Sequence, residues 1–338
     1  MSDRIRWGFI GASTIAREFM VNAVAQQPDG VLQAIFSTSA QRRQSFVEEY
    51  GFCSAYATLE ELLADEAIDA VYISTTNDLH AAQAIAAATA SKHVLCEKPL
   101  ATNIADAEAI GQACREAGVV LAVNHHLPNA ATHRAMRGLI ERGELGQLRA
   151  VRVFHARWLS VDLQTWRTGD ASAGAGVILD VTVHDAALLR FLMGEPIESV
   201  IAESFQQGLG ADGIEDAVMG VMVSASGVPI GFHDAWTVAH AGTGLEIHGS
   251  EASAFARESM TSQPVGEVVL RRGDRISEVE LEDREDLYVR AVRRFHQAVR
   301  EQGTLAVSGE DGIEALRVAL ATAEAARTGR RVAVESIG

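Results

Sequence analysis

Near its start the chain reads Ile5-Arg6-Trp7-Gly8-Phe9-Ile10-Gly11-Ala12-Ser13-Thr14-Ile15-Ala16. The apolar residues up to Ile10 predict a short buried strand, and the residues after the turn predict a helix. The apolar positions of that helix recur at the expected spacing: Phe19, Met20, Ala23 and Val24. The turn fits the pattern G-x-G-x-x-G/A, with Ser13 at the second glycine position and Ala16 at the third. Such a turn holds a dinucleotide pyrophosphate in many proteins, although a strand, turn and helix also occur without a ligand.

The alternation of strand and helix continues to about residue 124. Further strands are predicted at residues 31–36 and 69–74, in a segment ending at Cys96, and at residues 119–123. Asn103 is expected to cap a helix that runs to Ala117 and is closed by Gly118. Repeated β-α units predict an α/β domain with a doubly wound parallel sheet, spanning residues 1–124.

One of these strands ends at an acid, a base and a proline, in Val94-Leu95-Cys96-Glu97-Lys98-Pro99. Because Pro99 cannot donate a ladder hydrogen bond, Lys98 is expected at the carboxyl edge of the strand. In an open α/β sheet this edge faces the crevice in which ligands bind. Thr75, Lys98 and Asn124 each follow a strand, so all three should line the same edge. A solvated surface lysine is the alternative for Lys98 considered alone.

The end of the second strand carries no acidic residue. Residues 37–43 read Ser-Thr-Ser-Ala-Gln-Arg-Arg, whereas a free ribose 2′-hydroxyl is usually held by Asp or Glu near this point. The hydroxyls of Ser37 and Thr38, together with Arg42, suit a 2′-phosphate, so the sequence favours NADP(H). A helix cap by Ser37 or Ser39 explains the serines but does not explain the missing acid.

From residue 125 onward the pattern changes to strands that follow one another. They are predicted at residues 148–158, 197–204, 214–223, 228–236, 245–248 and 252–256, with a hairpin over residues 268–281. Helices are predicted at about residues 132–142, 285–302 and 310–327, the last capped by Ser308 with Asp311 at the third position. These elements predict a second domain of the α+β class, spanning residues 125–338.

A glycine-rich segment of this second half leads into Leu179-Asp180-Val181-Thr182-Val183-His184. Asp180 is well placed to cap a helix, and His184 lies on the same face one turn later. An acid and an imidazole at this spacing can share a hydrogen bond that fixes the imidazole and raises its pKa. A general acid near neutral pH requires such a pKa. A cap beside an incidental histidine is the alternative.

Composition argues against several classes of protein. The 45 Asp and Glu residues against 29 Lys and Arg give a formal charge of −16, which disfavours nucleic acid, and no apolar run approaches the roughly 20 residues that span a membrane. The three cysteines lack C-x-x-C spacing and indicate neither disulfides nor a thiolate metal site. His125, His126 and His133 lack a recognisable further ligand, so no metal is expected. The first strand is expected within a few residues of Met1, so we expect no signal peptide and a cytoplasmic location.

The chain resembles the glucose-fructose oxidoreductase and inositol dehydrogenase family, from Trp7 to about Gly329, in several motifs: G-A-S-T-I-A, T-T-N-D-L-H, E-K-P at residues 97–99, Trp166-Arg167 and D-x-x-x-H at residues 180–184. The resemblance implies an N-terminal Rossmann domain and a C-terminal α+β domain with an open, mostly antiparallel sheet that covers the nicotinamide. The implied and expected cofactor contacts are Gly11, Ala12, Ser13, Thr14, Ile15, Ser37, Thr38, Arg42, Thr75, Thr76, Asn77, His80, Glu97, Lys98, Asn124, Trp166 and Arg167.

The resemblance also implies the residues that act on the substrate. Lys98 is expected near the carbonyl, with Asp180 and His184 in proton transfer and substrate binding. Tyr288 offers a hydroxyl at the rim of the substrate site, although a core tyrosine is the alternative.

The expected function is the NADPH-dependent reduction of a sugar-derived ketone, with His184 as the proton donor. The resemblance implies 1,5-anhydro-D-fructose as that ketone, reduced at C2 to 1,5-anhydro-D-mannitol. A polyol or inositol dehydrogenase that uses NAD(P) is the main alternative. An NAD-dependent glycosidase would need an acid at the end of the second strand, and a non-catalytic dinucleotide sensor should have lost Lys98 or His184. We expect a monomer or a homodimer.

Overall fold

The computed structural model of the protein describes residues 4–338, and the few residues before the first strand, Met1, Ser2 and Asp3, lie outside the described part. The chain forms two compact units, one of Met1–His125 with Tyr288–Ile313 and the other of His126–Leu287 with Glu314–Gly338. The sequence predicted a division after residue 124. It did not predict that Tyr288–Ile313 would return to the first unit.

The first unit contains a parallel sheet with the strand order β3-β2-β1-β4-β5-β6. Its strands are β1 (Ile5–Ile10), β2 (Gly30–Phe36), β3 (Ser54–Tyr56), β4 (Ala70–Ile73), β5 (His93–Cys96) and β6 (Leu121–Val123). Its helices are α1 (Val21–Ala25), α2 (Ala40–Tyr50), α3 (Leu59–Leu63), α4 (His80–Thr89), α5 (Ile104–Ala117) and α8 (Leu287–Val299). This order, which reverses between β1 and β4, is the doubly wound Rossmann arrangement. The predicted fold class is therefore confirmed.

Helix α8 belongs to the first unit because its buried residues contact the start of the sheet. The indole nitrogen of Trp7 donates a hydrogen bond of 2.9 Å to Nε2 of His296, and the rings of Trp7 and Phe295 lie 5.0 Å apart. Since Nε2 accepts, the other ring nitrogen of His296 carries the hydrogen and donates to Asp29 at 2.9 Å. The amphipathic pattern of the helix predicts its buried face but cannot tell which core receives that face.

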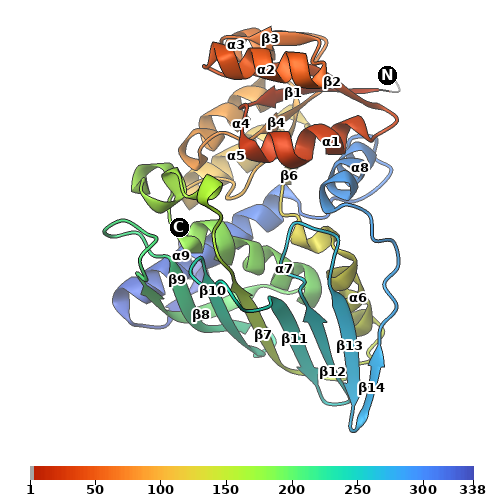
Figure 1. Ribbon diagram of the computed structural model, residues 1–338, viewed down its shortest axis with the longest axis vertical. Helices are drawn as coiled ribbons and strands as arrows, with labels where there is room; N and C mark the ends of the chain where they lie inside the picture. The colour runs from red at the N-terminus through yellow and green to blue at the C-terminus, as the bar shows by residue number, and fades with distance from the viewer. Residues whose placement is uncertain (1–3) are drawn as a thin grey trace. The chain divides into compact units, whose positions relative to one another are not determined.

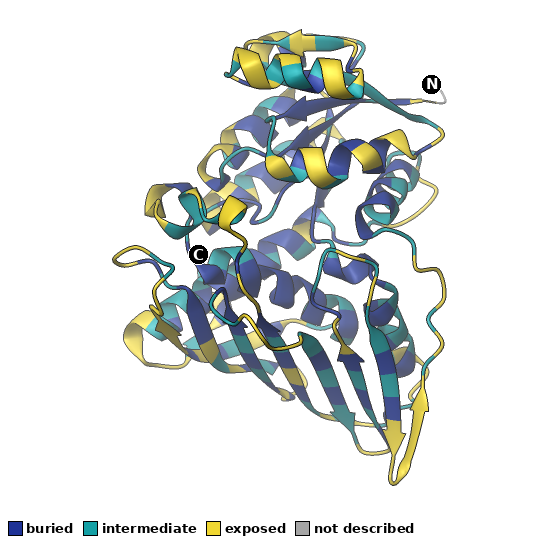
Figure 2. Cartoon of the chain, viewed as in Figure 1, coloured by how far each residue is buried: buried dark blue, intermediate teal, exposed yellow. Residues whose placement is uncertain are grey.

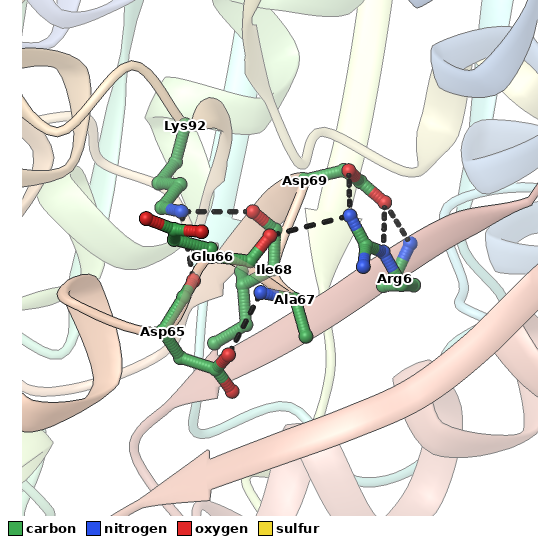
Figure 3. A network of polar contacts seen from close by, with 7 residues as sticks. All are labelled: Arg6, Asp65, Glu66, Ala67, Ile68, Asp69 and Lys92. Carbon is green, nitrogen blue, oxygen red and sulfur yellow. Dashed lines mark hydrogen bonds and ion pairs between the residues drawn. The ribbon is translucent and has the colours of Figure 1, made fainter. Parts of the chain in front are cut away.

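Opposite ends of β5 carry Lys92 and Lys98, which are the two lysines of the sequence. At the amino end, the ammonium group of Lys92 donates hydrogen bonds of 2.9 Å to the carbonyl oxygens of Asp65 and Ile68 (Figure 3). Beside it, Arg6 pairs with Asp69 at 2.8 Å. These contacts join the loop before β4 to the starts of β1 and β5, so Lys92 has a structural role.

The second unit contains a mixed sheet with the strand order β14-β13-β12-β11-β7-β10-β9-β8-β15 (Figure 1). Its strands are β7 (Leu148–Ala156), β8 (Ile197–Phe205), β9 (Ala217–Ser224), β10 (Pro229–Ala235), β11 (Gly244–Gly249), β12 (Ser253–Arg257), β13 (Glu267–Arg272), β14 (Arg275–Glu278) and β15 (Val332–Ala333). Strands β7 and β10 pair in parallel, and the other pairings of the described strands are antiparallel. The mostly antiparallel sheet is therefore confirmed.

Helices cover one face of this sheet. They are α6 (Ala131–Glu141), α7 (Val183–Met193) and α9 (Gly309–Thr328), whose first residues belong to the first unit (Figure 1). Ser308 caps α9 as predicted, accepting from the backbone N–H of Asp311 at 3.2 Å. Between residues 4 and 338, no helix combines the length and the apolar character that crossing a membrane requires.

Buried and more exposed residues alternate along the strands of the mixed sheet (Figure 2). Along β7, Val151, Val153 and His155 are buried on the face that the helices cover, whereas Arg152 and Phe154 point to the other face. That outer face forms an open hollow lined by Arg152, Phe154, Met219, His233, Phe255 and Arg257. The alternation of side chains along a pleated strand thus directs His155 towards the helices.

Candidate active site

The turn after β1 brings the backbone very close to β4. Gly11 has a φ of +106°, and a Cβ atom there would lie 3.0 Å from the carbonyl oxygen of Ser74, so a side chain would be both strained and crowded. The hydroxyl of Ser13 donates to the hydroxyl of Ser74 at 2.8 Å and accepts from the backbone N–H of Ala16 at 3.1 Å. The hydroxyl of Ser13, an expected cofactor contact, is therefore used to fix the turn itself.

The end of β2 has hydroxyls and arginines in the predicted positions. Ser39 is the residue that caps α2, since its side chain accepts from the backbone N–H of Arg42 at 3.3 Å. Ser37 is nearly buried, and the guanidinium of Arg43 donates to its carbonyl oxygen. Arg42 is exposed in the first turn of the helix. Arg43, which the sequence reading did not single out, is thus the arginine fixed to this strand end.

Thr75, Lys98 and Asn124 follow β4, β5 and β6, which are neighbours in the parallel sheet, so they lie at one edge as predicted. Two of these loops are joined by His80, which is fully buried. Its Nδ1 lies 2.9 Å from the carbonyl oxygen of Pro99, and its Nε2 lies 3.3 Å from that of Thr75. Burial lowers the pKa of His80, so the ring is neutral and donates through one nitrogen, for which the shorter contact is the better candidate.

Glu97 is the centre of a buried polar group at this edge. Its Oε1 accepts hydrogen bonds from the hydroxyl of Tyr72 at 2.7 Å and from Nδ2 of Asn124 at 2.6 Å. Burial raises the pKa of Glu97, and the bonds from Asn124 and Tyr72 oppose that rise. The Oδ1 atom of Asn124 is buried and has no hydrogen-bond partner among the described residues. An acceptor is therefore available on Asn124, the partner of Glu97, and the residue after Glu97 is the half-buried Lys98.

Two further residues of the first unit, His125 and Tyr288, are almost fully buried. His125 is 2% exposed, and burial, followed by the charge of Lys98, lowers its pKa to about 3, so its imidazole is neutral. Tyr288 is 2% exposed and stacks on Phe19 with ring centroids 4.5 Å apart. The structure thus gives Tyr288 the packing of a core residue, and its contact with substrate stays a prediction.

In the second unit, the prediction that Asp180 caps a helix is wrong. Asp180 lies inside a π-helical turn, η7 (Ile178–Thr182), whose N-cap is Val177 and which continues into α7. Nε of Arg167 donates to the carboxylate of Asp180 at 3.4 Å, and the same guanidinium lies 4.7 Å from the ring centre of Trp166. The sequence motif did not reveal this π-helical turn, whose hydrogen bonds span five residues instead of the four of an α-helix.

His184 lies in the first turn of α7 and is 6% exposed. Its ring meets that of His126 edge to face, with centroids 4.6 Å apart and an interplanar angle of 69°. The predicted hydrogen bond between Asp180 and His184 stays a prediction. The sequence analysis assigned no role to His126. In the structure, its ring contacts that of the candidate proton donor, His184.

The structure also reveals a buried polar cluster that sequence reasoning missed. Nδ1 of His155 lies 2.8 Å from Oδ1 of Asp185, and the hydroxyl of Thr182 donates to Oδ2 of Asp234 at 2.6 Å. The local sequence contains one indication of this cluster: Thr182 and Asp185 are three residues apart and therefore lie on the same face of a helix, next to His184. Across residues 4–338, no group of three or more His, Cys, Asp or Glu side chains is arranged to hold a metal ion.

Comparison with known proteins identifies related sequences and structures. Residues 5–125 match the model of an oxidoreductase family with an NAD-binding Rossmann fold, and residues 133–255 match the GFO/IDH/MocA C-terminal domain. A 1,5-anhydro-D-fructose reductase from Ensifer adhaerens is 47% identical over 331 residues, covering 98% of this chain and 99% of that protein. A myo-inositol 2-dehydrogenase from Thermotoga maritima is 29% identical, with coverage of 98% and 99%.

Among solved structures, the chain is similar to an aldose-aldose oxidoreductase from Caulobacter crescentus crystallised with glycerol. That similarity has a TM-score of 0.90 at 25% identity and covers 98% of this chain and 99% of the other. Both family models together account for most of the chain, including the strand-turn-helix at Gly11 and the segment with Asp180 and His184. The chain therefore belongs to the GFO/IDH/MocA family of oxidoreductases, whose cofactor is a nicotinamide dinucleotide.

Proposed function

We propose that the protein reduces 1,5-anhydro-D-fructose at C2 to 1,5-anhydro-D-mannitol, with NADPH as the reductant. The observation that carries this proposal is the 47% identity, over nearly the full length of both chains, to a 1,5-anhydro-D-fructose reductase. The polar side chains at the candidate site support a polyhydroxylated substrate, because a site built to hydrogen-bond hydroxyls discriminates against apolar ketones.

The preference for NADPH rests on the end of β2. Ser37 and Thr38 stand where a cofactor with a free 2′-hydroxyl would be met by an acid, and Arg42 and Arg43 follow in the first turn of α2. A phosphate beside two guanidinium groups gains charge-assisted hydrogen bonds that a ribose hydroxyl cannot form. We therefore assign 2′-phosphate recognition to Ser37, Thr38 and Arg42, with Arg43 bracing the loop through the Ser37 carbonyl.

The first unit fits a dinucleotide at its sheet edge. The approach of the backbone at Gly11 leaves no room for a side chain, and a helical segment begins at Ala16, directly after the turn. The buried Oδ1 of Asn124, which lacks a donor within residues 4–338, suits an amide N–H of the cofactor. The turn residues Gly11 to Ile15 would hold the pyrophosphate, and Thr75 to Asn77, Glu97 and Asn124 would hold the nicotinamide ribose and ring. When bound, the cofactor supplies the hydride.

The protein supplies the proton and the stabilisation of charge. We assign the proton donor to His184, whose imidazole would give a proton to the oxygen at C2 as that oxygen gains negative charge. The ammonium group of Lys98 would stabilise the same developing charge. Asp180 would orient His184, and Arg167 in turn holds the carboxylate of Asp180. Hydride to carbon and a proton to oxygen together balance the reduction of the ketone to an alcohol.

A steady-state screen tests the proposal. The decrease of NADPH absorbance is measured with 1,5-anhydro-D-fructose and with simple dicarbonyls, and NAD⁺ reduction is measured with inositols. The proposal expects the highest kcat/KM for 1,5-anhydro-D-fructose with NADPH. Faster oxidation of an inositol with NAD⁺ would make the protein a polyol dehydrogenase, the second candidate, which the 29% identity to a myo-inositol 2-dehydrogenase favours.

A further inference from the structure

Two acidic side chains meet in the core of the second unit. Asp185 on α7 and Asp234 on β10 are both 0% exposed, and their carboxyl groups lie within hydrogen-bonding reach of each other. Asp234 is also the direct register partner of His155, across the parallel pair β10 and β7. The helix and both strands thus contribute to one buried polar cluster.

Counting donors shows that this cluster lacks one proton if both acids are ionised. His155 supplies the N–H for Oδ1 of Asp185, and Thr182 supplies the O–H for Oδ2 of Asp234. The remaining oxygens, Oδ2 of Asp185 and Oδ1 of Asp234, have no donor within residues 4–338. Two carboxylates in contact would place like charges in a medium of low dielectric constant, and a proton between them removes both problems.

Of the two imidazoles nearest the cluster, His155 lowers the pKa of Asp234 without cancelling the effect of burial, and His133 carries no charge. Burial lowers the pKa of His133 on α6, the neighbour of His155, to about 4, so its imidazole is neutral at pH 7. Burial raises the pKa of Asp185 to about 7, and burial together with the charge of Asp185 raises the pKa of Asp234 well above its usual range. Asp234 is therefore the better proton holder and Asp185 the better acceptor.

We propose that Asp185 and Asp234 share one proton and that this acid pair positions His184 for the reaction. Thr182 and Asp185 are three residues apart, so they lie on one face of the helical segment and fasten it to β7 and β10. Asp180 and His184, four residues apart, lie on a neighbouring face of the same segment. The acid pair is thus a positioning device that acts on His184 through the helix, and this part of the inference rests on the proposed function.

Substitution by Asn tests the shared proton without using activity. Asn at position 234 can accept from Thr182 and donate to Asp185, which is the pattern of a protonated Asp. Urea unfolding of wild type and Asp234→Asn is compared from about pH 7.5 to about pH 9. Folded wild type holds a proton that the unfolded chain lacks, so its unfolding constant should rise about tenfold more per pH unit than that of the variant. Parallel curves would overturn the shared proton.

Kinetics tests the positioning role. Asp234→Ala removes the proton and leaves Thr182 and Asp185 without their partner, so kcat for ketone reduction should fall about 10- to 100-fold while the Kd for NADPH stays unchanged. Asp234→Asn should stay within about threefold of wild type and lose the alkaline limb of the pH profile. If Asp234→Ala fails to fold, Thr182→Val against Thr182→Ser provides the same comparison. Wild-type kcat in the folded Ala or Val variant would overturn the positioning role, whereas the unfolding experiment stands even if the substrate proves different.

Discussion

Glu97 provides the sharpest test of the candidate site in the first unit. Its carboxylate accepts hydrogen bonds from the side chains of Tyr72 and Asn124. These two residues are 0% and 2% exposed. Replacing Glu97 by Ala removes the oxygen that accepts from both donors and leaves a cavity in a buried site. The expected result is a loss of folding stability and a loss of affinity for NADPH, since Asn124 then loses its orientation.

The magnitude follows from the two orphaned donors. A buried donor left without a partner costs about 1 to 3 kcal/mol, so Glu97→Ala should destabilise the protein by about 2 to 6 kcal/mol. Glu97→Gln keeps an oxygen acceptor but adds the two N–H donors of an amide to the buried site, so it should cost about 1 to 2 kcal/mol. In a Tyr72→Phe background, the cost of Glu97→Ala should fall by about 1 to 3 kcal/mol, because one of the two donors is already absent.

These values are measured by urea unfolding, followed by circular dichroism and by Trp fluorescence. Because burial raises the pKa of Glu97 above its usual 4.5, the folded protein keeps this proton to a higher pH than the unfolded chain does. Stability contributed by the protonated group is therefore complete below about pH 4.5 and is lost as pH rises through the folded pKa. The advantage of wild type over Glu97→Gln should thus be largest in acid. A Glu97→Ala protein within about 0.5 kcal/mol of wild type, with unchanged NADPH affinity, would refute the reasoning.

Four further predictions concern function. His184→Ala should lower kcat about 10²- to 10⁴-fold with NADPH affinity intact, and near-normal turnover would return His184 to a packing role. Lys98→Met should lower kcat by a comparable factor, and stopped-flow measurement of the hydride step would locate the loss; an unchanged hydride rate would contradict the assignment. Arg42→Ala should weaken NADPH binding roughly 10- to 150-fold and leave NADH unchanged, with Arg43→Ala as the comparison; equal losses for both cofactors would disprove 2′-phosphate recognition. His126→Ala should lower kcat about 3- to 10-fold, whereas His126→Phe keeps an aromatic edge against His184 and should retain most activity; equal effects would rule out the ring contact as the cause.

The Rossmann unit could be predicted because its signals are local. Strand and helix periodicities, the cap at Asn103 and the turn at Gly11 each involve residues close in sequence, and each is present in the structure. Placing Thr75, Lys98 and Asn124 at one edge needed just one further rule, that parallel strands share their carboxyl ends.

The second unit could be predicted less fully because its decisive contacts are distant in sequence. Alternating apolar residues predict each strand but do not say that β7 and β10 pair in parallel, which is what puts Asp234 beside His155. The cap predicted at Asp180 failed because the helical segment begins earlier, with Val177 as the N-cap of a π-helical turn that has no local signal in the sequence. The partners of Asp185 come from two strands, so no spacing along the chain could have revealed them.

The placement of the two lysines at opposite ends of β5 makes this protein unusually suited to amine labelling. The sequence has no other lysine, so reductive methylation with ¹³C-formaldehyde adds isotope to just two side chains and the α-amino group. Burial lowers the pKa of Lys92, whose ammonium group faces two carbonyl oxygens, so its signal serves as an internal reference for the folded state. The remaining side-chain signal is that of Lys98. Nuclear magnetic resonance of the labelled protein can therefore follow a single candidate active-site amine through a titration with NADP⁺, with no need to assign a crowded spectrum.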